Sequence, residues 1–290
     1  MNRESRRSKE AVPASTNARR RILLTLAECY CASARDLTEY LYDTSGVSAV
    51  RNTNKLLKAL EREHLVNAVA YAPSDYAHGA LPKAWGLSAN GIRHAADGFP
   101  ETDPLEFKRT RSLLTLEHDV KCARTQLRLA KYCDEHGLDF YCQKTDLARS
   151  VDPDRLFAID NPATGRKAYF FYEAENRKKN FEDLFAKCEP YQKLYGSERC
   201  FHEWGEFTEF RVVLQFASEE RHDNFLAYLA GVCTCIYRRG KITHTCRPHA
   251  PLRRKTFWFT TDARIAGDPG GPIFRTPEDY AVRAYSFLDA

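Results

Sequence analysis

The segment 48–63, SAVRNTNKLLKALERE, limits the possible folds more than any other part of the chain, because its residues separate into two faces on a helix. At about 100° per residue, its four cations fall within one sector about 60° wide. These cations are Arg51, Lys55, Lys58 and Arg62. The apolar residues fall on the opposite side and are Val50, Leu56, Leu57 and Leu60. The pattern predicts a helix with one face on a core and a basic stripe on the other face.

Weaker patterns place this helix third in a row of helices and ahead of two strands. We expect Asp36 to cap the second helix. The expected elements are helices from residue 21, from 36 and over 48–63, strands over 65–71 and 83–87, and a short helix from 88. Three helices followed by a two-stranded hairpin is the order of a winged helix-turn-helix, whose third helix enters the major groove of DNA.

The basic helix therefore predicts binding of double-stranded DNA. Its cations suit phosphate groups, and polar side chains near its start suit base edges. The predicted DNA-binding residues are Ser48, Arg51, Asn52, Lys55, Lys58 and Arg62. The alternatives are a solvated surface helix and a winged helix that contacts only proteins.

From the sequence we expect neither a membrane-spanning nor a secreted protein. No run of 18 apolar residues exists, and the polar start of the chain does not resemble a secretory signal. The ten cysteines are irregularly spaced, which without a signal indicates reduced thiols and a cytoplasmic protein with no membrane partner. The net charge of +5 is modest, so a basic surface for a partner must be local.

With 290 residues, 43% of them hydrophobic, the chain has room for two domains with cores of their own. We expect α/β architecture. The expected segments are a basic flexible arm over 1–20, the winged helix-turn-helix over 21–98, a linker over 99–111, a nuclease-like α/β domain over 112–262 and a loop-rich tail over 263–290.

The second domain is predicted from the order of its elements, which are a helix, three strands, a helix and a strand. The helix spans about 112–135, the strands 138–143, 153–160 and 167–175, the next helix starts near 181, and the strand after it spans 210–216. A helix over 219–230 and a last strand over 257–261 are expected to follow. Pro190 predicts a kink or a late start in the second helix. This order is that of the restriction-endonuclease-like core shared by many metal-dependent nucleases.

Such enzymes hold a divalent metal between carboxylates on adjacent strands, and a lysine helps to position the attacking water. Asp154 stands where the first acid is expected, and Glu173 and Glu175 share one face of the third strand. Glu175 occupies the position expected for lysine. Lys187, on the following helix, is the best substitute, with Lys178 as a second choice. The candidate catalytic set is therefore Asp154, Glu173, Glu175 and Lys187, with the three acids as Mg²⁺ ligands and Glu117 or Asp119 as a further acid.

The favoured alternative is a structural remnant of a nuclease, without a cofactor. In that hypothesis the carboxylates pair with Arg177, Lys178 or Lys187. With Glu175 in place of the usual lysine, the three acids lack a built-in cation to orient the water, unless the helix turns Lys187 inward. We therefore expect weak or absent cleavage of DNA.

These stretches together resemble the replication-relaxation family of plasmids, integrative elements and prophages, over roughly Arg21 to Thr261. The matching stretches are the winged helix, Leu116–Val120, Pro153–Asp154, Tyr172–Glu175, and Lys187 with Tyr191. The family motif Glu-x-Asp is Glu-x-Glu here. The resemblance implies a DNA-binding protein that acts in replication, relaxation or conjugative transfer of a mobile element, and it does not by itself imply an enzyme.

Cysteines and histidine in a hairpin over 233–246 offer a second metal hypothesis. With its turn at 239–240, Cys235 lies opposite His244 and Cys233 opposite Cys246. Four positions on a flat face do not match the tetrahedral ligand geometry of zinc, and buried thiols are ordinary core residues. We expect these residues to be core and the protein to hold no zinc.

The sequence thus predicts a DNA-binding protein of a mobile element, a homodimer that has a relaxase or replication protein as a possible partner. One alternative is a metal-dependent DNA nickase, and another is a transcriptional regulator of the element.

Overall fold

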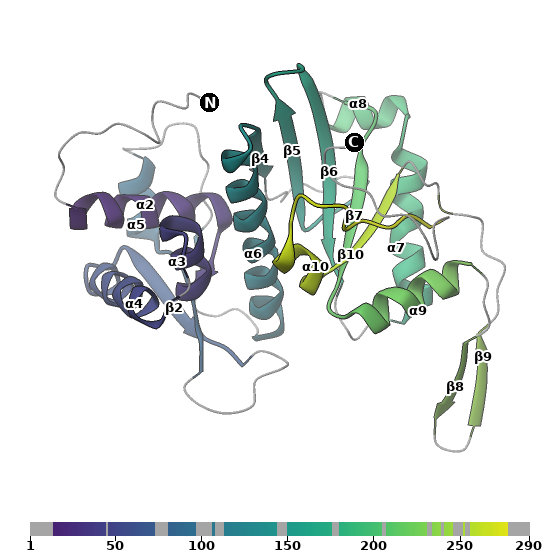
Figure 1. Cartoon of the computed structure of the whole chain (residues 1–290), viewed down its shortest axis with the longest axis horizontal. Coiled ribbons are helices and arrows are strands. Elements are labelled where there is room, and N and C mark those ends of the chain that lie inside the picture. The colour runs from purple at the N-terminus through teal and green to yellow at the C-terminus, as the bar shows by residue number, and fades with distance from the viewer. Residues whose placement is uncertain are drawn as a thin grey trace. The chain divides into compact units, whose positions relative to one another are not determined.

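The computed structural model describes most of the chain. The described residues are 14–44, 46–72, 81–96, 106–107, 113–143, 150–175, 180–204, 207–230, 234–238, 241–245, 252 and 256–277. They form a mixed α/β structure, which confirms the predicted fold class (Figure 1).

The chain divides into two compact units, Met1–Leu127 and Arg128–Ala290. The division falls within helix α6 (Leu113–Glu135), whereas the sequence places a linker at 99–111. Phe107, inside that expected linker, is fully buried, and its backbone N–H donates to the carbonyl of Leu87 at 2.9 Å. The described part of the expected linker therefore belongs to the packed structure of the first unit.

The first unit combines helices with a small antiparallel sheet. Its elements are α2 (Ala14–Cys29), β1 (Ala32–Ser33), α3 (Ala34–Tyr42), α4 (Val47–Arg62), β2 (Val66–Ala70), β3 (Lys83–Leu87), α5 (Ala89–Ala96) and the first half of α6. The sheet order is β1-β3-β2. Strands β2 and β3 pair in the predicted hairpin, from Val66 opposite Leu87 to Ala70 opposite Lys83.

Two predictions for this unit need correction. Helix α2 begins at Ala14, so the end of the expected flexible arm over 1–20 is helical; residues 1–13 lie outside the described residues. Helix α3 is capped by Ser33, whose hydroxyl oxygen accepts from the N–H of Asp36 at 3.1 Å. Asp36 instead lies in the first turn, and its carboxylate accepts from the Ser33 hydroxyl at 2.6 Å. The serine is the cap because it directly precedes the helix in extended conformation.

The core of the first unit is built from the apolar faces that the helical spacing predicted. Leu26, Leu37, Leu57 and Trp85 meet in one cluster, which also takes in Ala123 and Leu127 of α6. A neighbouring cluster joins Phe107 to Leu116 and Val120 of α6. The first half of α6 thus completes the core of the first unit.

The second unit is built on a mixed five-stranded sheet of order β10-β7-β6-β5-β4 (Figure 1). Its strands are β4 (Asp139–Gln143), β5 (Arg155–Asn161), β6 (Arg166–Ala174), β7 (Arg211–Phe216) and β10 (Phe257–Thr261). Its helices after α6 are α7 (Phe181–Leu194), α8 (Glu198–Trp204), α9 (Glu219–Leu229) and α10 (Asp262–Gly267). Strands β4, β5 and β6 pair antiparallel, and β6, β7 and β10 pair parallel.

Helices α7 and α9 cover one face of this sheet. Parallel neighbouring strands require crossover connections, and α7 lies in the crossover from β6 to β7 and α9 in that from β7 to β10. Phe171 of β6, Leu214 of β7 and Phe259 of β10 face the same cluster as Leu184 of α7 and Phe225 of α9. Every second residue of β6 points to this face, so Glu173 and Glu175 follow Phe171 on it.

Helix α7 begins at Phe181, where Asn180 caps it by accepting from the N–H of Asp183 at 2.7 Å. Pro190 lies within the helix, so the predicted late start is wrong. The strong cap at Asn180 starts the helix nine residues ahead of the proline.

A separate two-stranded sheet pairs β8 (Thr234–Arg238) with β9 (Lys241–Thr245). Cys235 lies opposite His244, which confirms the predicted register. Cys233 and Cys246 lie outside the described residues. The expected loop-rich tail contains most of helix α10 and a bridge between Phe259 and Arg275. No helix in the described ranges has both the length and the apolar character needed to cross a membrane.

Candidate functional site

Helix α4 presents the predicted basic face. Thr53, Leu57 and Leu60 are its buried residues. All six predicted DNA-binding residues are exposed: Ser48, Arg51, Asn52, Lys55, Lys58 and Arg62. Within the part of the chain that the structure describes, no carboxylate forms an ion pair with these four cations. The charge of this face is therefore available to an anionic partner.

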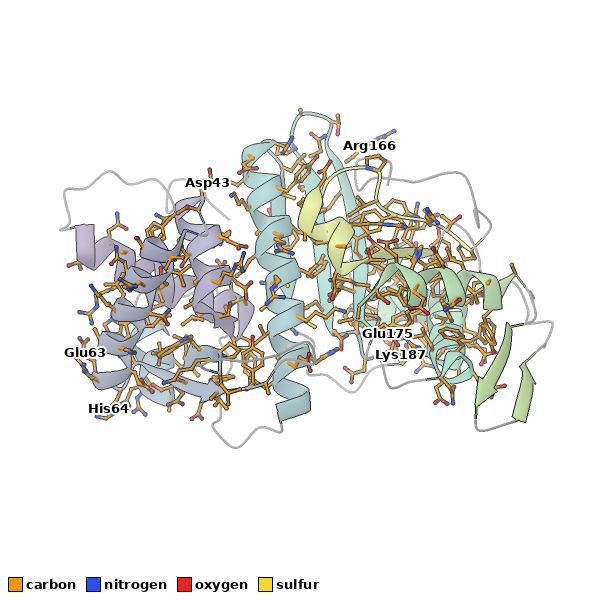
Figure 2. The ribbon with its side chains drawn as sticks, turned by 60° about the horizontal axis from the view of Figure 1, so that its bottom comes forward. Asp43, Glu63, His64, Arg166, Glu175 and Lys187 are labelled. Atoms are coloured by element: carbon orange, nitrogen blue, oxygen red, sulfur yellow. The ribbon has the colours of Figure 1, made fainter. Side chains whose placement is uncertain are left out.

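Contacts between α3 and α4 fix the position of the basic face of α4. The hydroxyl of Thr38 on α3 lies 2.8 Å from the hydroxyl of Thr53 on α4, and both threonines are fully buried. Asp43 ends α3 in the left-handed conformation, and α4 starts after Gly46 (Figure 2). Gly46 has no side chain to cap α4, so the backbone N–H groups of the first turn point to the helix start without a side-chain acceptor there. A helix start of this kind favours anions.

The far end of α4 is joined to α2 by an ion pair. Glu63 caps the helix through its backbone N–H and forms an ion pair with Arg19 of α2, and His64 follows it with a positive φ. The Arg19–Glu63 pair connects α2 to the end of α4, so the basic face belongs to a helix anchored at both ends.

The second candidate site lies where β5 and β6 meet. Arg155 pairs with Tyr172, which places the preceding Asp154 beside Glu173. A carboxylate oxygen of Asp154 accepts from the backbone N–H of Ala174 at 2.7 Å. The sequence prediction that Asp154 approaches Glu173 is confirmed in geometry.

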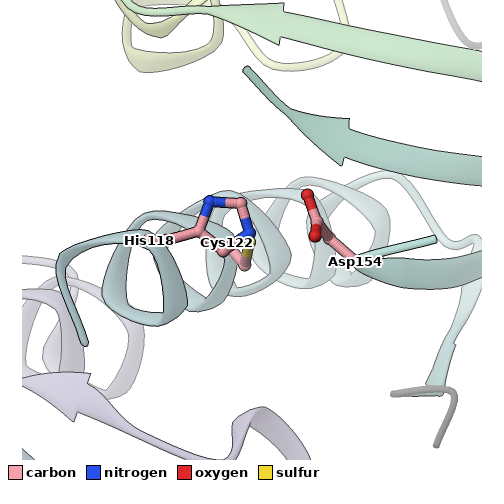
Figure 3. A group of neighbouring side chains, drawn as sticks. All are labelled: His118, Cys122 and Asp154. Atoms are coloured by element: carbon pink, nitrogen blue, oxygen red, sulfur yellow. The ribbon is translucent and has the colours of Figure 1, made fainter. Parts of the chain in front are cut away.

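Asp154 precedes β5, and Figure 3 shows its carboxylate beside that strand. The same figure labels His118 and Cys122, which lie one turn apart on α6. The further candidate acids Glu117 and Asp119 are also on the first half of α6, which belongs to the first unit.

Helix α7 supplies two partners to Glu173. Lys187 forms an ion pair with one carboxylate oxygen of Glu173, and the hydroxyl of Tyr191 donates to the other oxygen at 2.5 Å. Lys187 and Tyr191 are four residues apart, so one face of the helix carries both. The Glu173 side chain is 4% exposed, whereas that of Lys187 is 33% exposed.

Glu175 pairs with a different cation, Arg221 of α9. Nε of Arg221 on α9 donates to one carboxylate oxygen of Glu175 at 2.7 Å, and Nη2 donates to the same oxygen at 2.5 Å. The Arg221 guanidinium also lies over the ring of Phe181, 5.0 Å from its centroid. Lys187 thus pairs with Glu173, as the hypothesis of a structural remnant expected, and Arg221 supplies Glu175 with a cation that the sequence did not indicate.

Burial and like charge shift the ionisation of this cluster. Burial, with the nearby Asp154 carboxylate, raises the pKa of Glu173 from 4.5 to about 8, against the lowering effect of Lys187 and Tyr191. Burial disfavours the charged form of Lys187, but the carboxylates of Glu173 and Asp154 outweigh it and raise the pKa of the ammonium. Lys187 therefore stays positively charged at neutral pH.

We expect Glu173→Gln to flatten the dependence of stability on pH. Because folding raises the pKa of Glu173 above 4.5, this carboxyl favours the folded state fully below pH 4.5 and loses that contribution as the pH rises to about 8. The slope for one proton reaches about 1.4 kcal/mol per pH unit. Urea unfolding at intervals from pH 5 to 8.5 measures it. Glu189→Gln, an exposed site on the same helix, is the control, and equal slopes in both variants would contradict the prediction.

The sequence missed Arg221, since nothing near it in the chain indicates that α9 approaches the end of β6. Tyr191 was named through its place in the helical stripe of α7 and through the family resemblance, and its contact with Glu173 appears in the folded chain. Arg177 and Lys178, the other proposed partners of the carboxylates, lie outside the described residues.

The fold and the two charged sites define an α/β protein with a basic helical face in one unit and a buried acidic cluster in the other. A family model described as replication-relaxation matches residues 23–209, more than half of the chain. The chain therefore belongs to the replication-relaxation family, which indicates a role in the replication or relaxation of mobile elements. Searches of curated proteins and of solved structures found no match.

Proposed function

We propose that the chain is a DNA-binding protein of a mobile genetic element and that α4 contacts duplex DNA. The observation that carries this proposal is the exposed basic face of α4, whose four cations have no carboxylate partner among the described residues. Family membership supports it, because replication and relaxation act on DNA.

In this proposal the first unit is a winged helix-turn-helix. Helices α3 and α4 are the helix pair, and β2 with β3 forms the wing. Cations from Arg51 to Arg62 contact phosphates, while Ser48 and Asn52 near the start of α4 contact base edges in the major groove. The phosphate contacts supply affinity and the base contacts supply sequence preference.

The second unit is proposed to be a nuclease-like domain with little or no catalytic activity. Its order of elements from α6 to β7 is that of the restriction-endonuclease-like core, apart from the inserted helix α8. We propose that it serves dimerisation or binds a relaxase or replication protein in the cytoplasm.

Replacing Lys55 and Lys58 with Ala should weaken binding to all duplex sequences. Each lost phosphate contact reduces the slope of log affinity against log salt concentration by about 0.9, so the double variant should be shallower by about two units. Fluorescence anisotropy with a labelled duplex, over a series of salt concentrations, measures both effects.

The matched control is Lys193→Ala with Arg199→Ala, which removes two exposed cations from the second unit. This control should keep the wild-type salt slope. A wild-type slope in the Lys55 and Lys58 variant would place the DNA surface elsewhere.

Metal-dependent nicking is the second candidate function. The observation that favours it is the placement of Asp154 beside Glu173 on adjacent strands, with Lys187 at the pair. We expect weak or absent nicking of supercoiled plasmid with Mg²⁺ or Mn²⁺, and retained DNA binding in the Asp154→Ala, Glu173→Ala variant. Robust nicking by the wild type that disappears in this variant would make the protein an enzyme.

A further inference from the structure

A nuclease-like domain implies a divalent metal, and the predicted ligands can be tested against this requirement. Mg²⁺ binds through carboxylate oxygens that are open to it. Both carboxylate oxygens of Glu173 already contact Lys187 and Tyr191. One oxygen of Asp154 accepts from the N–H of Ala174, and one oxygen of Glu175 accepts twice from Arg221. Glu173 therefore offers a metal ion no open oxygen, and the set of three acids does not fit the ion as it stands, although the second oxygen of Glu175 has no hydrogen-bond partner among the described residues.

We propose that the ammonium group of Lys187 takes the place of a divalent cation between Glu173 and Asp154. The ion pair with Glu173 puts the positive charge at the carboxylate that a metal would share with Asp154. Asp154 lies beside Glu173 across the β5–β6 pair, so the ammonium that contacts Glu173 is placed at this pair of acids. This inference concerns the second unit and stands independently of DNA binding by α4.

The packing of α7 holds Lys187 in this position. Tyr191, one turn further along, is buried, and its ring packs on Phe171 of β6 with ring centroids 5.5 Å apart. Its hydroxyl donates to Glu173. The neighbouring Cys188 is also buried, with its thiol donating to the Leu184 carbonyl at 3.3 Å. The side of α7 that carries Lys187 is thus fixed against the sheet.

Removing the ammonium should expose a metal site. Without Lys187, the neighbouring carboxylates of Asp154 and Glu173 lose the cation that contacts Glu173, and paired carboxylates of this kind bind Mn²⁺ or Mg²⁺. A lysine that supports a bound metal predicts the opposite, because its loss would weaken metal binding.

The test measures Mn²⁺ binding by electron paramagnetic resonance at pH 8 on the full chain. We expect Lys187→Met to bind one Mn²⁺ at least tenfold more tightly than the wild type. Lys193→Met, an exposed lysine on the same helix, should match the wild type. Adding Glu173→Gln to Lys187→Met should abolish the gained binding. Stoichiometric binding by the wild type that weakens in Lys187→Met would overturn the proposal.

A second comparison does not require Lys187→Met to fold. If the internal ammonium occupies the site, Mn²⁺ binding by the wild type and by Glu173→Gln should be equally weak. Wild-type binding that falls at least tenfold in Glu173→Gln would show that Glu173 already binds the metal and would reject the proposal. No DNA is present in either test, so neither result depends on the function of α4.

Discussion

Replacing Phe171 with Ala should lower the free energy of unfolding of the second unit by about 3–5 kcal/mol. Phe171 is fully buried at the centre of the face covered by α7 and α9. Its ring centroid lies 4.7 Å from that of Trp204, 4.7 Å from that of Phe210 and 5.5 Å from that of Tyr191. The substitution removes these contacts and leaves a cavity that three surrounding rings cannot easily fill. Urea unfolding followed by tryptophan fluorescence measures the loss.

Phe201→Ala is the matched control for this prediction. The same substitution there removes a side chain of α8 that is 53% exposed. Its effect should stay within about 0.5 kcal/mol, because little apolar contact is lost. Similar losses in the two variants would mean that Phe171 is not central to the core of this unit.

Replacing Gly91 with Ala should destabilise the first unit by about 3 kcal/mol or more. A methyl group at Gly91 would lie 1.9 Å from the carbonyl oxygen of Leu65, which is backbone and cannot turn away. The same carbonyl accepts from the N–H of Ser88 at 3.1 Å, and the Ser88 hydroxyl accepts from the N–H of Gly91 at 3.0 Å. The methyl group would therefore separate α5 from the start of β2. Thermal unfolding of the variant should show the loss.

Gly46→Ala provides the control within the same unit. The added methyl group would meet only the Thr44 hydroxyl, at an ordinary distance of 3.5 Å, and the backbone φ of −58° suits any residue. We expect a loss below about 1 kcal/mol, the cost of a poorer helix cap. A Gly91→Ala variant as stable as Gly46→Ala would show that α5 and β2 are not held at the distance described.

Local patterns were sufficient to predict most of the elements. Helix α4 and strand β6 were foreseen because the apolar residues in them recur at helical spacing or form one aromatic run. Strand β1 was missed because two residues carry no periodicity, and it exists through its pairing with β3. Helices α8 and α10 were missed because each has seven residues or fewer.

The division between the units could not be derived from local patterns. The apolar stripe of α6 is continuous in sequence from Leu116 to Cys133, and spacing alone does not say which core receives each residue. The structure assigns Leu116, Val120 and Leu127 to the clusters of the first unit. Burial depends on which elements meet a helix face, and that is a property of the tertiary structure.

The basic face of α4, the common side of Glu173 and Glu175, and the family could all be predicted from local sequence. Helical and strand periodicity decide which side chains share a face, so the two faces needed no knowledge of distant contacts. The cation that each glutamate receives, Lys187 for Glu173 and Arg221 for Glu175, is set by the tertiary structure. These ion pairs join residues 14 and 46 positions apart, and the approach of α7 and α9 to the sheet is set by the shared apolar core rather than by the charges.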